Sequence, residues 1–137
     1  MQLGFFTMPI HPPSRSLTET LKEDRELVLL AEELEFTEGF IGEHITDGAE
    51  NITSPLIFIA WLLRETSRIK LGTGTVNLPI HHPAVVAAEV AMIDHMAELL
   101  KVNFKMKYYT ILEQFCNSAN TFPHVGPNHI SLLELVM

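Results

Sequence analysis

The chain has 137 residues, of which 47% are hydrophobic and 19% charged, and this is enough for one ordinary domain with a buried core. Nine basic against seventeen acidic residues give a formal net charge of -8, which would repel a phosphate backbone and disfavours nucleic acid as a partner. Cys116 is the single cysteine, so no internal disulfide can form and a cytoplasmic protein is expected. No apolar run is long enough to span a membrane.

The first predicted elements are a short strand, a proline-rich loop and a helix. Residues 1–6 form a short apolar segment typical of a buried strand, which the three prolines of residues 9–13 end. Ser16 and Glu19 match a capping box, in which the serine hydroxyl and the glutamate each satisfy a free backbone amide. Four apolar residues then recur at helical spacing and predict the buried face of this helix: Leu27, Leu30, Ala31 and Leu34.

A second strand and a second helix follow. Residues 38–42 are short, apolar and rich in glycine, which predicts a buried strand that ends at Glu43 and His44. Ser54 followed by Pro55 is a good helix start, because serine caps the first turn and proline suits the first helical position. We expect this helix to continue through an apolar run to about Thr66.

The third strand, within residues 69–83, contains Gly72 and Gly74. Glycine in a buried strand usually marks a bulge or the close approach of another backbone or a flat ligand. A kink that serves only packing fits these residues equally well. We expect the strand to be irregular at Gly74 and Thr75. The helix that starts at Pro83 is apolar nearly all round, so we expect it to be buried on two sides.

Three strand-helix repeats with short connections are typical of parallel βαβ units. In such folds function collects at the carboxyl ends of the strands, whether the sheet is open or closed. Three loops share that edge here, at residues 7–13, 43–51 and 73–83. They bring together side chains that are far apart in the sequence: Met8, His11, Glu43, His44, Thr73, Gly74, Thr75, Asn77, His81 and His82.

Several of these segments together resemble the bacterial-luciferase-like flavin monooxygenases. The motifs lie at residues 3–9 (LGFFTMP), 41–44 (IGEH), 71–79 (LGTGTVNLP) with 82–83 (HP), and 94–96 (DHM). The first two are most similar to the limonene and alkane monooxygenase branch. The resemblance covers residues 2–98 and implies an α/β fold, in which the chain supplies the first three βα units of a (β/α)8 TIM barrel.

The resemblance also implies roles for individual residues. His44 would be the catalytic histidine, with the acidic Glu43 beside it able to alter its charge state. Phe6 would lie near the flavin ring, and Gly74 with Thr75 would form a bulge behind the ring, which in several members contains a cis peptide. Three further assignments are less direct. Thr73, beside the bulge, would also contact the cofactor, and Asn77 would either bond a flavin edge or only stabilise a turn. Met8 would either contact the substrate or serve only in packing.

The implied reaction is oxygenation of a small apolar organic substrate with O2 and reduced FMN, which a partner flavin reductase supplies. One alternative is a deazaflavin-dependent hydride-transfer oxidoreductase, since that group shares the barrel and the bulge. Another is a non-catalytic fragment that acts through subunit association. A metal site is disfavoured, because His81 and His82 are adjacent and point in different directions on an extended chain. We also expect a homodimer or larger assembly through the second and third helices.

The resemblance ends after Glu98. Residues 101–108 alternate between polar and apolar, which describes a strand wet on one face rather than a buried barrel strand. The remaining residues are rich in turn formers. We therefore expect a partial luciferase-like domain at residues 1–98 and a divergent, irregular tail at residues 99–137, in a truncated or frame-shifted family member.

Overall fold

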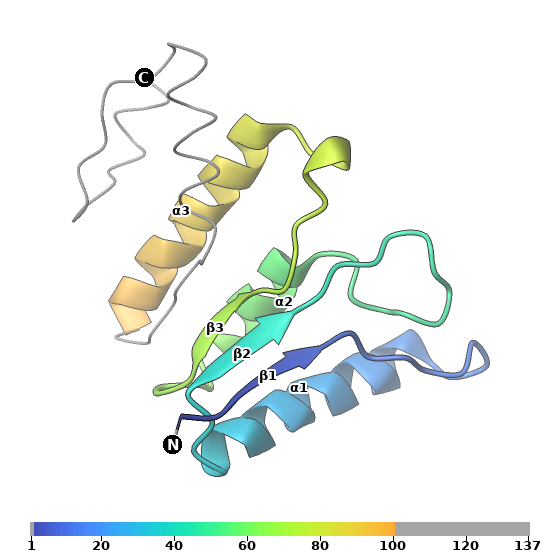
Figure 1. Cartoon of the computed structure of the whole chain (residues 1–137), viewed down its shortest axis with the longest axis horizontal. Coiled ribbons are helices and arrows are strands. Elements are labelled where there is room, and N and C mark those ends of the chain that lie inside the picture. The colour runs from blue at the N-terminus through green and yellow to red at the C-terminus, as the bar shows by residue number, and fades with distance from the viewer. Residues whose placement is uncertain (1, 101–137) are drawn as a thin grey trace.

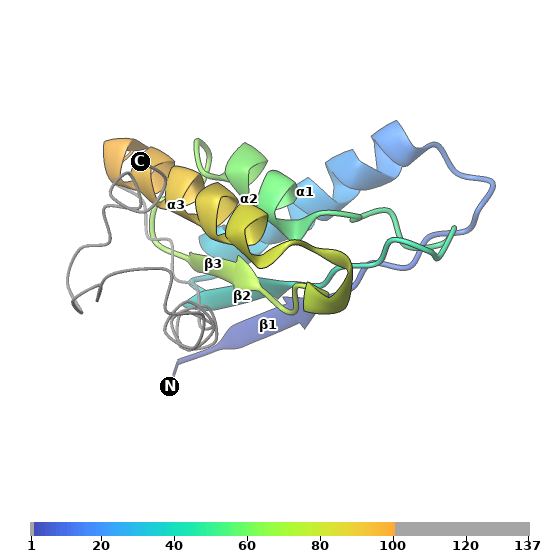
Figure 2. The ribbon, with the colours of Figure 1, turned by 90° about the horizontal axis from the view of Figure 1, so that it is seen from above.

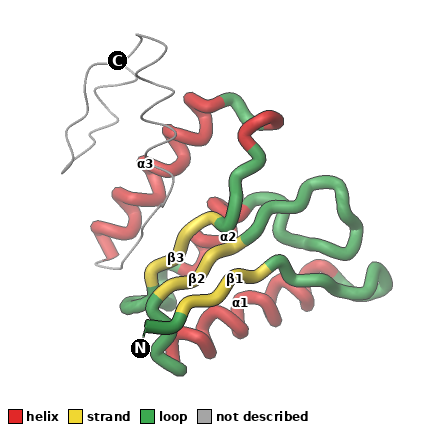
Figure 3. Tube along the Cα trace, viewed as in Figure 1, coloured by secondary structure: helices red, strands yellow, loops and turns green. Residues whose placement is uncertain are grey.

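The computed structural model of the chain describes residues 2–100, in which strands and helices alternate (Figure 1). The strands are β1 (Gly4–Thr7), β2 (Glu38–Ile41) and β3 (Lys70–Thr73). The helices are α1 (Leu17–Glu33), α2 (Pro55–Leu62) and α3 (Pro83–Leu100), with a short 3-10 turn, η1 (Leu78–Ile80), between β3 and α3 (Figure 3). The strand expected at residues 101–108 and the tail after it lie outside the described residues.

The three strands form one parallel sheet in the order β1-β2-β3. Phe6 lies opposite Phe40, and Phe40 lies opposite Gly72, so one row of residues runs straight across the sheet. Parallel neighbours need a long crossover connection, which α1 and α2 provide. All three helices lie on the same face of the sheet (Figure 2). This arrangement confirms the prediction of three consecutive βα units.

The hydrophobic core lies between the sheet and its helices. Ile41 and Leu71 of the strands are buried against it, and burying each such side chain stabilises the fold by roughly 1.5–3 kcal/mol. The helices and connections contribute most of the other fully buried residues: Val28, Ile59, Leu62, Leu63, Ile69, Val86 and Val90. The core therefore covers one face of the sheet and leaves the other face without a helix layer.

Helix α1 begins at the predicted place but without the predicted capping box. Ser16 is the N-cap residue, yet its side chain makes no capping hydrogen bond. The Thr20 hydroxyl instead lies 3.2 Å from the Ser16 carbonyl oxygen, and the Thr20 backbone N–H also donates to that carbonyl. Helix formation at this end thus depends on the backbone and on Thr20.

The buried face of α1 also differs from the prediction. The leucine stripe (Leu27, Leu30 and Leu34) is roughly half exposed or more, and the buried residues are Thr20, Asp24, Val28 and Ala31. Two of these four are polar, and both find partners inside the fold. A stripe that is partly polar therefore faces the sheet, and the more apolar stripe beside it lies on the surface.

Helix α2 starts as predicted. The Ser54 side chain accepts a hydrogen bond from the Ile57 backbone N–H at 3.3 Å, and Pro55 occupies the first helical position. The helix ends at Leu62, earlier than expected, although Thr66 reaches back to donate to the Leu62 carbonyl at 3.2 Å.

Helix α3 is buried on one side rather than two. Its inner side carries Val86, Val90, Ile93 and Ala97, whereas Met92 on the outer side is 63% exposed. The outer side is mixed, because the exposed Val85 and Met92 alternate there with the charged Glu89 and Asp94. No helix within residues 2–100 combines the length and the apolar character needed to cross a membrane.

Glu32, near the end of α1, fastens this helix to the connection between α2 and β3. Its carboxylate accepts hydrogen bonds from three successive backbone N–H groups, those of Ser67 at 3.0 Å, Arg68 at 2.9 Å and Ile69 at 2.8 Å. Burial favours the neutral carboxyl, but the bonds from Ile69, Arg68 and Ser67 outweigh it, so the pKa of Glu32 is lowered.

Replacing Glu32 with glutamine should reduce the free energy of unfolding by roughly 1–3 kcal/mol, because one neutral oxygen must replace two charged ones. The lowered pKa stabilises the fold fully above the ordinary value of 4.5, and this contribution is lost as the pH falls through the folded-state value. Denaturant titrations of parent and variant should therefore converge in acid. Glu33→Gln, at the exposed neighbouring position, is the control. A difference that stays constant with pH would contradict the assignment.

Candidate functional site

The loops that follow the three strands are joined at the carboxyl edge of the sheet. Ile10 of the β1–α1 loop forms an antiparallel bridge with Glu50 of the β2–α2 loop. Next to this bridge the His11 backbone N–H donates to the Ala49 carbonyl at 2.8 Å, and the two loops run side by side (Figure 1). The β3–α3 loop is tied to the end of β2 by Glu43. The predicted clustering of these loops is confirmed.

Glu43 is the most deeply buried charged side chain of this edge, with a side-chain exposure of 1%. One carboxylate oxygen accepts from the Asn77 backbone N–H at 3.1 Å, and the other lies 2.8 Å from His81 Nε2. A buried carboxylate is costly unless it is hydrogen-bonded, and both oxygens have a partner here. Glu43 thus holds the β3–α3 loop against β2.

His44, the next residue, faces a different carboxylate. Its Nε2 lies 3.1 Å from Glu50 Oε2, and the side chains are 36% and 11% exposed. Consecutive side chains of an extended segment point to opposite sides, so Glu43 and His44 do not share a partner. Glu43 is therefore paired with His81 and not with His44, and His44 is paired with Glu50.

His11 belongs to a third histidine–carboxylate pair, which supports the loops. Its Nε2 lies 2.9 Å from Asp24 Oδ1, and Asn51 Nδ2 donates to Asp24 Oδ2 at 2.9 Å and to Thr20 Oγ1 at 2.8 Å. This network explains why polar residues of α1 are buried. It also takes His11 out of the candidate site, because its imidazole serves to anchor the β1–α1 loop to α1.

His82 lies apart from these pairs. Its Nδ1 accepts a hydrogen bond from the Ala84 backbone N–H at 3.3 Å and so helps to begin α3. Within residues 2–100 no group of three or more histidine, cysteine or acidic side chains is placed to hold a metal ion.

The sheet face that lacks helices carries an apolar shelf, formed by Phe6, Met8, Gly42 and Gly74. Phe6 is 56% exposed. A Cβ atom on Gly74 would lie 2.3 Å from Phe6 Cε2, and one on Gly42 would lie 2.1 Å from Met8 Cγ. Each glycine therefore leaves the space in which one of the two large side chains lies. The shelf joins the ends of all three strands.

Strand β3 ends at Thr73, and the chain bends at Gly74. The Gly74 backbone N–H still donates to the Ile41 carbonyl, but no regular strand continues from Thr73 to Val76. This confirms the predicted irregularity at Gly74 and Thr75. No cis peptide bond occurs among residues 2–100, so the bend is made with trans peptides.

Three of the expected flavin-binding residues, Thr73, Thr75 and Asn77, lie outside the apolar shelf. Thr73 is buried and, like Leu71 two residues earlier, faces the helices, so its side chain points away from the shelf. Its Oγ1 has no hydrogen-bond partner among the described residues. Thr75 and Asn77 are exposed at the start of the β3–α3 loop. The backbone N–H of Asn77 is already used by Glu43.

Positive charge at this edge is limited. Among residues 2–100, Arg15 is the one lysine or arginine in the three loops. Its two guanidinium nitrogens donate to the two carboxylate oxygens of Glu23, at 2.8 and 2.7 Å. This hydrogen-bonded pairing raises the pKa of Arg15 and lowers the pKa of Glu23. The shelf therefore fits one face of a flat, largely apolar ring, whereas a phosphate would have to compete with Glu23 for Arg15.

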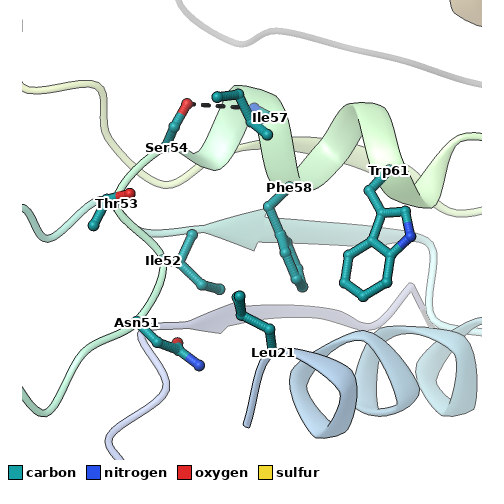
Figure 4. Close-up of a pocket in the computed structure, with 8 residues that line it drawn as sticks. All are labelled: Leu21, Asn51, Ile52, Thr53, Ser54, Ile57, Phe58 and Trp61. Carbon is teal, nitrogen blue, oxygen red and sulfur yellow. Dashed lines mark hydrogen bonds between the residues drawn. The ribbon is translucent and has the colours of Figure 1, made fainter. Parts of the chain in front are cut away.

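A pocket of about 230 Å³ lies in the helix layer, between α1 and α2 (Figure 4). Trp61 packs edge-on against Phe58, with ring centroids 6.0 Å apart, and Arg25 lies over the Trp61 ring. Arg25 also pairs with Glu65, and this hydrogen bond raises the pKa of Arg25. The pocket is separate from the shelf, which is on the opposite face of the sheet. It is lined by Leu21, Asn51, Ile52, Thr53, Ser54, Ile57, Phe58 and Trp61.

Sequence reasoning missed Glu50, Asp24 and the pairing of His81 with Glu43. Each contact joins segments that local patterns treat separately: a strand end and a loop, or a loop and a helix. The one available signal was the frequency of histidine and acidic residues in the three edge loops. That signal does not predict which histidine pairs with which carboxylate.

The family model for the luciferase-like monooxygenases matches residues 1–98. Limonene 1,2-monooxygenase of Rhodococcus erythropolis is 38% identical over 97 residues, which are 71% of this chain and 25% of that protein. The 2,5-diketocamphane 1,2-monooxygenase 2 of Pseudomonas putida is 33% identical over 98 residues, 72% of this chain and 27% of that protein. The chain thus spans about a quarter of the length of these relatives.

Solved structures agree on the fold. The oxygenating constituent of 3,6-diketocamphane monooxygenase from Pseudomonas putida, a type II Baeyer-Villiger monooxygenase solved in complex with FMN, superposes with a TM-score of 0.71. It is 21% identical, and the match covers 94% of this chain and 42% of that one. The coenzyme F420 dependent tetrahydromethanopterin reductase from Methanopyrus kandleri superposes with a TM-score of 0.55 at 24% identity, over 77% of this chain and 26% of that one.

The family match over residues 1–98 includes the four motifs, the three strands and the bend after β3. At such low identities the solved structures establish the fold alone. The family model covers more than half of the chain and establishes the family. The chain therefore belongs to the luciferase-like monooxygenase family, and residues 2–100 form three βα units of the TIM-barrel fold of that family.

Proposed function

We propose that this chain serves the flavin-dependent oxygenation of a small apolar organic substrate, with reduced FMN and O2. Relatives at 30–38% identity are named as monooxygenases of limonene, of diketocamphane and of alkanals. The observation that carries the proposal is the apolar shelf at the carboxyl edge, with His44 close by in the sequence and on the same edge. When bound, reduced FMN would supply the chemistry that activates O2.

The shelf residues would hold the flavin ring. Phe6 and Gly74 offer it an apolar surface, and the exposed Thr75 and Asn77 offer polar groups to its edge. Thr73 would contribute through its backbone alone, because its side chain faces the helices. Met8 extends the shelf and would contact the apolar substrate, from which the same surface would exclude water. In this proposal the described residues would supply the ring-facing half of a site.

His44 would hold or move a proton at the reacting substrate. Its side chain is accessible at 36%, and imidazole can take up or release a proton near neutral pH. Glu43 would act on the site indirectly, through the position of the β3–α3 loop.

The test of this function is oxygen incorporation by the 137-residue chain. FMN, NADH, a flavin reductase and labelled O2 would be supplied with limonene or a diketocamphane, and products analysed by mass spectrometry. One labelled oxygen atom should appear in the product, and omission of the reductase should abolish it. Bound FMN without any labelled product would contradict the proposal and leave a non-catalytic role.

The alternative of deazaflavin-dependent hydride transfer has weaker support. The F420 dependent reductase shares the fold at 24% identity, whereas the relatives above 30% named here are monooxygenases. Titration with the deazaflavin would separate the two readings, because the alternative requires tighter binding of that coenzyme than of FMN.

We also propose a homo-oligomer in which α2 and α3 form the contact, a flavin reductase as a functional partner, and a cytoplasmic location. The exposed apolar side chains of these two helices include Ile57, Trp61, Val85 and Met92, of which Ile57 and Trp61 also line the pocket beside α1. Large exposed apolar side chains on adjacent helices support an interface there. The domain division near residue 98 is proposed because the family match ends there.

Met92→Glu should weaken this association strongly, because the buried contact would then contain an unpaired charge. Met92 is chosen because it is 63% exposed, whereas Val86 is 1% exposed and a glutamate there would disrupt the core. Sedimentation at micromolar concentration should show the parent as a dimer or larger and the variant as a monomer. Thr18→Glu adds the same charge to the exposed surface of α1 and is the control. A monomeric parent that stays in solution would refute the assembly.

A further inference from the structure

We infer that Glu50 is the residue that positions His44, and that Glu43, its neighbour in sequence, instead positions the β3–α3 loop through His81. The inference deepens the proposed function and rests on the role of His44 given there. Both carboxylates are positioning residues in this assignment, because neither lies on the shelf itself.

The first support is the geometry of the two pairs. Glu50 Oε2 lies 3.1 Å from His44 Nε2 as an ion pair, and Glu43 Oε1 lies 2.8 Å from His81 Nε2 with the geometry of a hydrogen bond as well. The second oxygen of Glu43 accepts from the Asn77 backbone N–H, so both oxygens of that carboxylate have partners from the β3–α3 loop. Glu43 has no free oxygen directed to His44.

The second support is that Glu50 is held in place. Its side chain is 11% exposed, and its backbone takes part in the antiparallel bridge with Ile10. The neighbouring Ala49 carbonyl accepts from the His11 N–H, and the next residue, Asn51, is bonded to Asp24 and Thr20. An exposed ion pair on a mobile loop contributes little. Glu50 is instead an anchored acceptor.

The chemical consequence concerns the tautomer of each imidazole. An ionised carboxylate can only accept hydrogen bonds, so a neutral histidine beside it must carry its proton on the facing nitrogen. An Nε2 lone pair on His44 would be repelled by the facing Glu50 carboxylate, so this pair favours the Nε2–H form and leaves Nδ1 with a lone pair, which can accept a proton from a substrate. Glu43 fixes the Nε2–H form of His81 in the same way and keeps residues 77–81 beside β2.

The experiment compares Glu50→Gln and Glu43→Gln in the full 137-residue chain. Long-range proton–nitrogen NMR spectra report the tautomer of each imidazole directly. They would be recorded at about pH 9, where histidines are neutral, and assigned with His44→Gln and His81→Gln. A glutamine can present either its oxygen or its NH2 group, so it no longer imposes one tautomer.

In Glu50→Gln the ratio of Nε2–H to Nδ1–H forms at His44 should fall on the order of tenfold, while His81 is unchanged. In Glu43→Gln the same loss should occur at His81, while His44 is unchanged. Backbone amide exchange at Asn77 should also accelerate in Glu43→Gln alone, because its acceptor is weakened. Thermal unfolding identifies a variant that does not fold, and Glu50→Ala and Glu43→Ala then repeat the comparison.

A His44 tautomer that responds to Glu43→Gln and not to Glu50→Gln would overturn the inference, and so would one that responds to neither. The rate of product formation tests the proposed role of His44 separately from the two histidine–carboxylate pairings. If the tautomers respond as expected but His44→Ala forms product at the parent rate, the pairings are upheld and the proposed role of His44 is refuted.

Discussion

Replacing His44 with alanine should lower the rate of oxygenated product formation by roughly 10² to 10⁴-fold, the range typical of a lost general acid–base group. The side chain is removed without disturbing the core, because His44 is partly exposed and its backbone N–H, which donates to the Ile52 carbonyl at 3.1 Å, is retained. The measurement is the rate at which labelled oxygen enters the product at saturating FMN, with the active parent chain as the reference.

His95→Ala is the matched control for this variant. His95 lies on the outer part of α3, half exposed and 3.9 Å from Glu98, far from the edge loops in sequence and structure. Its loss should leave the rate within a factor of about two, as for other surface changes. An unchanged rate in His44→Ala, with folding intact, would return His44 to a structural role.

Gly74→Ala should both destabilise the fold and weaken FMN binding. The added Cβ would lie 2.3 Å from Phe6 Cε2 and 3.2 Å from the Ile41 carbonyl carbon, so the Phe6 ring must leave its place on the shelf. Overpacking a core costs about 1–3 kcal/mol, and we expect the lower end of this range here, because the Phe6 ring is 56% exposed and can turn aside. Denaturant unfolding measures the loss of stability, and quenching of flavin fluorescence measures the loss of FMN affinity. If about 1 kcal/mol is lost from binding, the affinity should fall about fivefold.

Two further variants make this result specific. Gly48→Ala should be nearly neutral, because nothing lies within 4 Å of an added Cβ there. Phe6→Ala removes the obstructing ring, so Gly74→Ala should cost little stability in that background, and the two effects should be strongly non-additive. Additive effects would show that Gly74 is needed for its backbone conformation and not for its contact with Phe6.

Local signals in the sequence predicted the local features well. Ser54 and Pro55 begin α2 as expected, because both capping and the proline preference act within one turn. The bend after Thr73 was predicted from Gly74, because a glycine that interrupts an aliphatic strand has few other uses. The alternation of three strands and helices then limited the fold to parallel βαβ units.

Features that depend on distant partners were not predictable. The leucine stripe of α1 is more apolar than the stripe that is buried, and Asp24 is buried because His11 and Asn51 reach it from two loops. Adjacency in sequence favoured Glu43 as the partner of His44, whereas a bridge between loops brings in Glu50. The contact of Phe6 with Gly74 likewise joins residues of β1 and of the β3 end, and no local pattern encodes it.

The bridge between Ile10 and Glu50 also links the β1–α1 loop to the residue that faces His44. Ile10 is strongly exposed and follows Met8 by two residues, so it stands just beyond the shelf at the end of β1. Its backbone partner is the residue whose carboxylate faces His44. Because Glu50 takes part in both contacts, a substitution in the β1–α1 loop that opened the bridge would also release the backbone of the residue that faces His44.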